Sequence, residues 1–185
     1  MERRRDDRRV IYTKMMLKES LINLLEKKDI SKISVKEICK NADINRTTFY
    51  NHYNDQYDLM RKLENELIEN IGIHLAKYTR DGTDVALVEI LEEIFEYIKE
   101  NAKLCKILLS EKGNLDFQKR IMMLVYDKDI SNLFNKNIFS KEDMDYVYSF
   151  IITGCIGVIQ KWLEDNMKKS TRSMAEMIID LITDI

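Results

Sequence analysis

The sequence has no proline and only five glycines among its 185 residues. Proline breaks helices and glycine weakens them, so their scarcity predicts long, uninterrupted helices and an all-α fold. No uncharged apolar run reaches the roughly 18 residues that a membrane-spanning helix needs. The charged N-terminus also lacks the apolar core of a signal peptide. We therefore expect a cytoplasmic protein with no membrane partner.

Cysteine and histidine are also scarce. Cys39, Cys105 and Cys155 are widely separated, and their spacing fits neither a set of metal ligands nor a redox pair. We expect them to be small core residues in a reducing compartment. The sequence has two histidines, lacks a glycine-rich phosphate loop, and shows no nucleophile patterned beside a base. It therefore predicts no cofactor, no metal site and no enzyme activity.

Charge is unevenly distributed, although the net charge is only −2. Residues 1–62 hold 15 Lys and Arg against 10 Asp and Glu, whereas residues 63–185 hold 15 against 22. A basic N-terminal third on an acidic body favours a localised face that binds a polyanion such as nucleic acid, although many charge runs are only solvated surface.

Apolar residues at helical spacing predict about nine helices in two domains. The first domain, residues 1–57, combines a basic arm with a three-helix helix-turn-helix DNA-binding unit. The second domain, residues 58–185, is a helical domain for effector binding and dimerisation. We expect a loop at residues 80–83 and helices at about 13–28, 34–42, 46–52, from 55 onward, 84–100, 102–111, 115–136, 140–165 and 172–184.

Two capping signatures define a short helix-turn-helix at residues 34–53. Ser34 can accept a hydrogen bond from the backbone of Glu37, whose side chain can accept one from the backbone of Ser34. Residues 43–45 form a turn, and Asn45 is a suitable N-cap for the second helix. Because two short helices joined by a turn are common in helical proteins, this geometry alone does not identify a DNA-binding site.

The second of these helices carries an unusual set of polar side chains. From Arg46 to Tyr53 the chain presents a guanidinium, hydroxyls, an amide and an imidazole, with Phe49 as an apolar anchor. Threonine, tyrosine, asparagine and histidine are poor helix formers, so their hydrogen-bonding groups explain their presence better than helix propensity does. Such groups bind phosphate oxygens and base edges in the major groove. The helix is therefore predicted to read DNA.

The same segment resembles the DNA-binding domain of the TetR/AcrR family of transcriptional regulators. The resemblance rests on Ile33–Cys39, Ala42–Asn45, Thr47–Tyr53 and Asp55–Leu59, with Thr-Phe-Tyr-x-His as its most specific core. It implies a homodimeric regulator, more specifically a repressor, that binds a palindromic operator in double-stranded DNA. It also implies that a small-molecule effector modulates this binding.

The resemblance further assigns roles to individual residues. It implies phosphate contacts from Thr48, Tyr50 and His52 and base-edge contacts from Arg46, Thr47 and Asn51. Apart from the resemblance, we expect Lys36 on the first helix of the pair to add a phosphate or minor-groove contact, and we include Asn45 and Gln56 in the DNA-binding surface. Arg46 stands at the N-terminus of its helix, where a guanidinium can make a bidentate contact to guanine.

This sequence departs from the family pattern at three positions. Asp43 and Thr47 stand where the family has glycines, and Gln56 replaces a phosphate-binding lysine, which removes one ionic contact. Alternatives remain for some contacts: Tyr50 could brace the helices, and His52 could be a solvated or capping residue. The arginine arm at residues 3–9 could attract DNA diffusely or enter a groove.

Two glycines, Gly154 and Gly157, lie in the expected helix at residues 140–165. Each costs ~1 kcal/mol relative to alanine in a helix interior, so a close approach of another backbone is expected there. In the resembled family the last two helices form a four-helix dimer interface, and the alternative is a contact within one chain. The implied interface residues are Ile151, Ile152, Cys155, Val158, Ile159, Trp162, Met174, Met177, Ile178 and Leu181.

The C-terminal half resembles a subtype found in activators of dihydroxyacetone kinase operons. This resemblance rests on residues 95–101, 108–110 and 154–163. Because some members of that subtype respond to a protein, an alternative function is a DNA-binding co-activator controlled by a protein partner through the C-terminal domain.

Overall fold

A computed structural model describes residues 2–77, 84–110, 115–126, 140 and 142–183 of the chain. Within these residues the fold consists of helices and contains no strand, which confirms the predicted all-α class. The helices are α1 (Glu2–Leu25), the 3-10 helix η1 (Ile30–Lys32), α2 (Val35–Ala42), α3 (Arg46–Tyr50), α4 (Gln56–Leu75), α5 (Asp84–Glu100), α6 (Ala102–Leu109), α7 (Leu115–Tyr126), α8 (Met144–Glu164) and α9 (Thr171–Thr183).

The chain divides into two compact units, residues 1–66 and 67–185, and α4 contributes to both. The start of α4 belongs to the first unit because Leu59 and Leu63 are buried and Glu66 forms an ion pair with Lys18 of α1. The functional division expected at residue 57 remains a prediction. The predicted loop at residues 80–83 and the end of the predicted helix at 115–136 lie outside the described residues.

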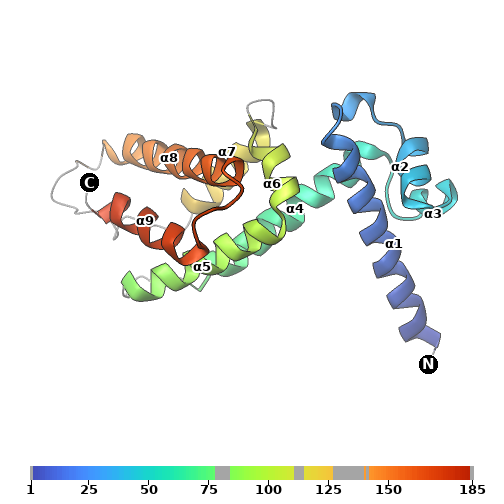
Figure 1. The fold of residues 1–185 in the computed structure, drawn as a ribbon, viewed down its shortest axis with the longest axis horizontal. Coiled ribbons are helices and arrows are strands. Elements are labelled where there is room, and N and C mark those ends of the chain that lie inside the picture. Colours follow the sequence, from blue (N-terminus) through green and yellow to red (C-terminus); the bar gives the residue numbers. More distant parts are fainter. Residues whose placement is uncertain (1, 78–83, 111–114, 127–139, 141, 184–185) are drawn as a thin grey trace. The chain divides into compact units, whose positions relative to one another are not determined.

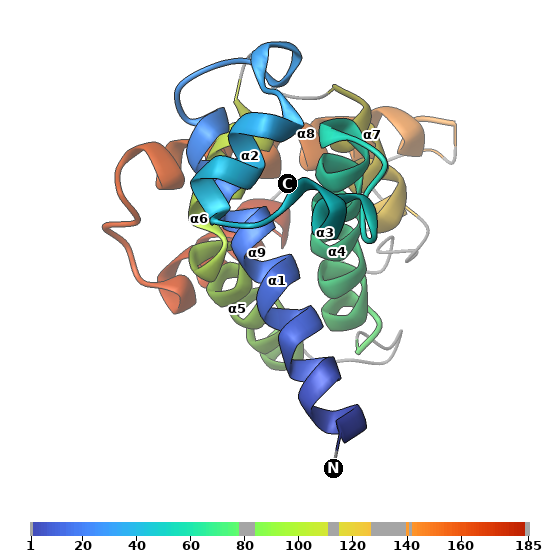
Figure 2. The same ribbon diagram turned by 90° about the vertical axis from the view of Figure 1, so that its right-hand side faces the viewer.

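In the first unit α1 begins at Glu2, well before the predicted start at residue 13. The arm has no apolar stripe to reveal a helix, but it also has no proline or glycine to prevent one. Figures 1 and 2 show that the N-terminal half of α1 extends beyond α2 and α3. The other half anchors the unit: Leu17 and Leu21 are fully buried, and Ser20 donates a hydrogen bond to the Ile38 carbonyl at 2.8 Å.

The start of α2 is fastened to the segment that follows α1. Glu37 accepts from the Ser34 backbone N–H at 3.0 Å, and the Ser34 hydroxyl accepts from the Glu37 N–H at 3.3 Å. This pair is the predicted capping box. Lys28 lies 2.5 Å from the second oxygen of Glu37. These donors, Lys28 first and then Ser34, lower the pKa of Glu37 from 4.5 to about 2.

Glu37 is therefore expected to make the stability of the first unit depend on pH under acid conditions. Because folding lowers the pKa of Glu37, its contribution is complete above pH 4.5 and is lost as the pH falls toward about 2. In Glu37→Gln the side chain cannot ionise, so the stability gap between wild type and variant should narrow over that window. Denaturant melts at about pH 7, 4 and 2.5 measure the gap; a gap independent of pH contradicts the prediction.

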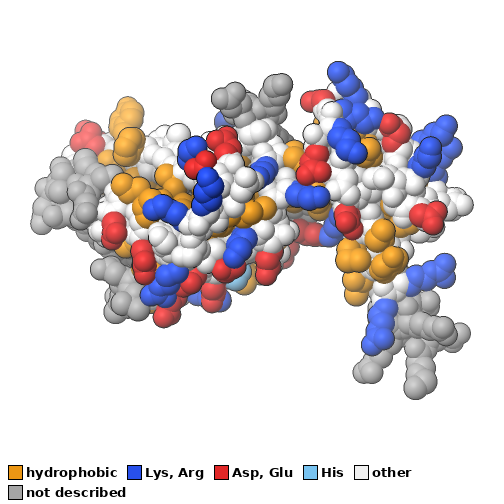
Figure 3. Space-filling view, viewed as in Figure 1, with side chains coloured by type: hydrophobic (Ala, Val, Ile, Leu, Met, Phe, Trp, Pro, Cys, Tyr) orange, Lys and Arg blue, Asp and Glu red, His pale blue; other side chains and the backbone are white. Residues whose placement is uncertain are grey.

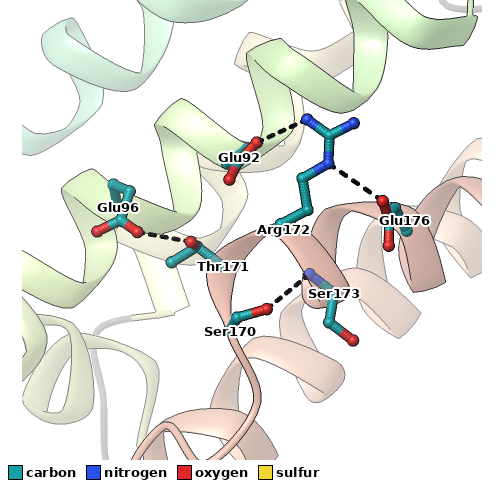
Figure 4. A network of polar contacts seen from close by, with 7 residues as sticks. All are labelled: Glu92, Glu96, Ser170, Thr171, Arg172, Ser173 and Glu176. Atoms are coloured by element: carbon teal, nitrogen blue, oxygen red, sulfur yellow. Dashed lines mark hydrogen bonds and ion pairs between the residues drawn. The ribbon is translucent and has the colours of Figure 1, made fainter.

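In the second unit α5 and α9 pack against each other, and a polar network joins them (Figure 4). Arg172 at the start of α9 bridges Glu92 of α5 and Glu176, at 3.1 Å from each. The buried Thr171 hydroxyl donates to Glu96 at 2.5 Å. The first turn of α9 is thereby held on α5.

The long helix α8 combines a buried face with an exposed apolar one. By length and composition alone, this helix would be long and apolar enough to cross a membrane. Some of its apolar residues belong to the core of the second unit instead, because Ile152, Ile156 and Leu163 are buried there. The helix starts at Met144 instead of residue 140. Ser140 nevertheless accepts from the Asp143 backbone at 3.2 Å, in the turn that leads into the helix.

The three cysteines are free thiols. Cys39 and Cys105 are buried, as predicted, and burial raises the pKa of Cys105 to about 12. Cys155 is only half-buried, in the middle of α8. Burial also raises the pKa of Cys155, to about 11.

Candidate nucleic-acid interface

The turn between α2 and α3 places a non-glycine residue in the left-handed region. Asp43 ends α2 with φ 55° and ψ 43°, and the backbone N–H of Ile44 donates to the Cys39 carbonyl at 2.9 Å. Left-handed backbone angles favour glycine, but aspartate tolerates them better than most residues. The turn therefore forms with Asp43 in place of the glycine that is usual in the family.

Helix α3 is short and held at both ends by specific contacts. Asn45 caps its start, as predicted, by accepting from the Thr47 N–H at 2.9 Å. The helix ends at Tyr50, two residues before the predicted end. Beyond it, the amides of His52 and Tyr53 both donate to the Phe49 carbonyl, at 2.9 Å each. This carbonyl is the last that continues the helical pattern.

Phe49 anchors α3 in the first unit. Its side chain is fully buried, and its ring lies 5.6 Å from the ring centre of Tyr53, which is also buried. Tyr50, the next residue, meets Phe49 edge-on but keeps 57% of its surface exposed. One side of α3 is therefore fixed in the core while the other faces outward.

All nine predicted DNA-binding residues keep accessible surface. Six are exposed, and the other three are half-exposed; the exposed ones are Lys36, Asn45, Arg46, Thr47, Tyr50 and Asn51, and the half-exposed ones are Thr48, His52 and Gln56. Eight of them lie along α3 and the chain on either side of it, whereas Lys36 lies at the start of α2. The Arg46 guanidinium makes no ion pair with any residue that the structure describes. The surface of α3 thus offers donors to an external polyanion.

Helix α4 begins at Gln56, one residue after its predicted start, and carries a residue that sequence reasoning did not identify. Asp55 accepts from the Asp58 N–H at 2.7 Å and so caps α4. Lys62 reaches back to the segment after α3, where its Nζ donates to the His52 carbonyl at 2.8 Å. The available sequence signal was the spacing of Asp58 and Lys62, which places opposite charges one turn apart. Among the described residues, no group of three or more His, Cys, Asp and Glu could hold a metal ion.

Half of the residues predicted for a dimer interface are buried in the core of the protomer itself. Ile151, Ile152, Trp162, Met174 and Ile178 are buried within the second unit. Trp162, for example, meets Phe95 edge-on at 5.2 Å and donates from its indole to the Lys169 carbonyl at 2.9 Å. Sequence periodicity does not separate these core residues from exposed ones because both recur at helical spacing.

The other predicted interface residues remain accessible to different degrees. Cys155, Val158, Ile159 and Met177 are half-buried, and Leu181 is 51% exposed. Phe150, which was not predicted, is 68% exposed on the same groove as Leu181.

Two connected grooves run between α8 and α9. The more apolar groove has a volume of about 400 Å³ and the other of about 460 Å³, and they share Gly154, Val158 and Met177. Figure 3 shows apolar side chains along this part of the surface. A Cβ added at Gly154 or Gly157 would meet no heavy atom within 4 Å. The close backbone approach expected at these glycines is therefore not made by the described residues of this chain, and the space stays open.

An all-helical protein with a doubly capped helix-turn-helix and an outward-facing polar α3 belongs to the class of helix-turn-helix regulators. Residues 86–184, about half of the chain, match a TetR family model described as "Transcriptional regulator C-terminal region". The chain belongs to the TetR family of transcriptional regulators, and DNA binding follows from that membership.

Relatives support the same assignment. An uncharacterized HTH-type transcriptional regulator of Bacillus subtilis (strain 168), YxbF, is 30% identical over 111 residues, which are 59% of this chain. The aligned part is only 26% of YxbF, so the chain matches about a quarter of that protein's length.

Solved structures share the fold. A TetR transcriptional regulator from Streptococcus agalactiae 2603V superposes with a TM-score of 0.65 at 24% identity, over 96% of this chain and 97% of that one. The dihydroxyacetone kinase operon activator DhaS superposes with a TM-score of 0.55 at 18% identity, over 93% and 94%. DhaS therefore shares the fold of this chain. Membership of the subtype that the C-terminal sequence suggests remains a prediction.

Proposed function

We propose that this TetR-family regulator is a cytoplasmic repressor that binds a palindromic operator as a homodimer, with α3 of each protomer in a major groove. The observation that carries the proposal is the division of α3 into two faces. Phe49 is fully buried, whereas Arg46, Thr47 and Tyr50 point polar groups outward from a helix only five residues long. A helix built in this way serves recognition better than it serves packing.

The contacts expected from α3 fall into two kinds. Thr48, Tyr50 and His52 offer hydroxyl and imidazole groups suited to phosphate oxygens, which set register and orientation. Arg46 and Thr47 lie in the first turn, the part of a recognition helix that reaches base edges. Lys36 at the start of α2 is exposed and suited to a further phosphate.

A selection from random double-stranded DNA tests the operator. At low salt, the wild-type protein should enrich a palindrome whose half-sites are centred about 10 base pairs apart, or at a multiple of that spacing. The same selection at roughly tenfold higher salt is the control, because binding through phosphates falls steeply with salt. Enrichment of no palindrome at low salt overturns the proposed function.

The grooves between α8 and α9 support a dimer interface at this face. The exposed Phe150 and Leu181 flank an open strip along Gly154 and Gly157, where a partner helix could approach closely. Of the residues predicted for the interface, those that the chain leaves accessible are the ones proposed to meet the partner. The buried ones pack in the core of the second unit, under the face that α8 and α9 present.

Filling the glycine strip is expected to break the dimer and leave the protomer folded. In the double variant Gly154→Leu, Gly157→Leu, the new side chains enter space that the chain leaves open. Overpacking an interface costs about 1–3 kcal/mol per site, so dimerisation should weaken at least tenfold. Sedimentation measures this effect, with Ser149→Leu as control because Ser149 is exposed on α8 and lines neither groove. A double variant as dimeric as the control contradicts the interface.

We further propose that a small-molecule effector acts through the second unit. The alternative, control by a protein partner, predicts a stoichiometric protein that co-purifies through residues 84–170 from the native cell. Release of the selected operator by small-molecule extract, with no such protein, supports the effector.

A further inference from the structure

One lysine joins the two sides of the turn between α3 and α4. The ammonium of Lys62 donates to the His52 carbonyl at 2.8 Å and lies 4.8 Å from the ring centre of Tyr53. Asp58, one helical turn before Lys62 on α4, pairs with it at 3.4 Å. Asp58 also accepts from the Asn54 backbone N–H at 2.9 Å. The two α4 side chains therefore hold the backbone on both sides of Tyr53.

The end of α3 depends on such external support. A helix of five residues is far too short to be stable by itself, and the last carbonyls of any helix lack partners within it. An ammonium at this end supplies a donor and also complements the negative end of the helix dipole. Asp58 keeps its charge because the Asn54 backbone N–H, together with Lys62, holds the pKa of Asp58 below its usual value.

The Lys62 ammonium is directed at the protein. It is engaged by the His52 carbonyl, the Tyr53 ring and the Asp58 carboxylate, and Tyr53 is only 3% exposed. Tyr53 in turn packs against Phe49, the buried anchor of α3. Lys62 thus contacts the end of α3 in two ways: directly, at the His52 carbonyl, and indirectly, through the Tyr53 ring that packs on Phe49.

We propose that Lys62 is a positioning residue for operator binding. It fixes the segment after α3, and with it the orientation of His52 and Tyr50 toward phosphate, without contacting DNA itself. This inference rests on the DNA-binding function proposed above. It deepens that function by assigning part of the binding affinity to a residue outside the recognition helix.

Salt dependence separates positioning from direct phosphate contact. Affinity for DNA falls as salt rises, and each lysine that neutralises a phosphate makes the slope of log affinity against log salt steeper by about 0.9, because it releases a counterion. A positioning residue changes affinity and leaves that slope as it is. The exposure of the Lys62 side chain, 47%, makes this distinction necessary.

The test compares three variants on the operator selected by the wild-type protein. Lys62→Met keeps the apolar stem and removes the ammonium, whereas Lys62→Arg keeps a donor and a cation. Lys99→Met is the matched control: the Lys99 side chain is 50% exposed and pairs with Glu96 at 3.5 Å in the second unit. Lys62→Met should bind roughly three- to tenfold more weakly, as for a lost charge-assisted hydrogen bond that is partly exposed, with an unchanged salt slope. Lys62→Arg and Lys99→Met should bind within about twofold of wild type.

Amide hydrogen exchange supplies a measurement that needs no DNA. In Lys62→Met the amides of His52 and Tyr53 should exchange faster, while those of α2 keep their wild-type rates and show that the unit is folded. Two results overturn the positioning role and leave the proposed function intact. One is an unchanged operator affinity of Lys62→Met; the other is a plot of log affinity against log salt whose slope is shallower by about one than that of wild type. If the wild-type protein selects no operator, the proposed function itself fails.

Discussion

Arg46→Ala is expected to weaken operator binding about five- to 150-fold and to relax the base preference at one position of each half-site. A bidentate guanidinium contact to guanine is worth about 1–3 kcal/mol of discrimination, which corresponds to this range. Arg46 is suited to that contact because it is exposed in the first turn of α3 and forms no ion pair with the residues that the structure describes.

The matched variant for Arg46→Ala is Tyr50→Phe, which removes one hydroxyl from the same helix. If that hydroxyl binds phosphate, all sequences should be bound more weakly by the same factor and base preference should persist. Binding titrations against the operator and every single-base variant of one half-site measure both effects. Equal loss over all bases in Arg46→Ala would assign Arg46 to phosphate, and no loss in either variant would disprove the contact assignment.

Phe49→Ala should cost the first unit about 3–5 kcal/mol of unfolding free energy, because it removes a fully buried ring from a small core. The loss is large compared with the stability of a small domain, so much of the helix-turn-helix should be unfolded near physiological temperature. The second unit has its own core and should retain its unfolding transition.

Tyr50→Ala is the control for Phe49→Ala, since it removes an aromatic ring from the neighbouring position. Its side chain is 57% exposed, and exposed substitutions usually change stability by no more than about 0.5 kcal/mol. Tyr50→Ala should therefore melt like wild type and still bind DNA poorly, whereas Phe49→Ala should lose both. Urea denaturation followed by helix content decides between them; equal stability losses at the two positions would show that the burial of α3 has been misassigned.

Local features of the fold could be predicted because neighbouring residues determine them. Ser34 and Glu37 are three residues apart, and that spacing alone allows their capping box at the start of α2. Asn45 likewise caps α3 through a residue only two positions away. The left-handed turn at Asp43 is equally local. These contacts involve residues close in sequence, so the helix-turn-helix and its outward residues could be placed without a structure.

Contacts between distant residues could not be predicted in this way. The apolar residues of α8 and α9 recur at helical spacing whether they face the core or the surface, so Trp162 of α8 and Leu181 of α9 could not be distinguished from the sequence. Only the packing of α5, α8 and α9 shows that Trp162 is 4% exposed and Leu181 51%. The same holds for Gly154, whose surroundings proved open instead of occupied.

The sequence by itself determined the all-helical class, the family and the chemistry offered by α3, because these depend on composition and short-range order. The tertiary structure decided which apolar residues stay accessible and which side chain contacts the backbone that follows α3. Lys62 shows the reason: its contact with the His52 carbonyl joins residues ten positions apart across a turn. The direction of such a side chain depends on the angle between two helices, and only packing sets that angle.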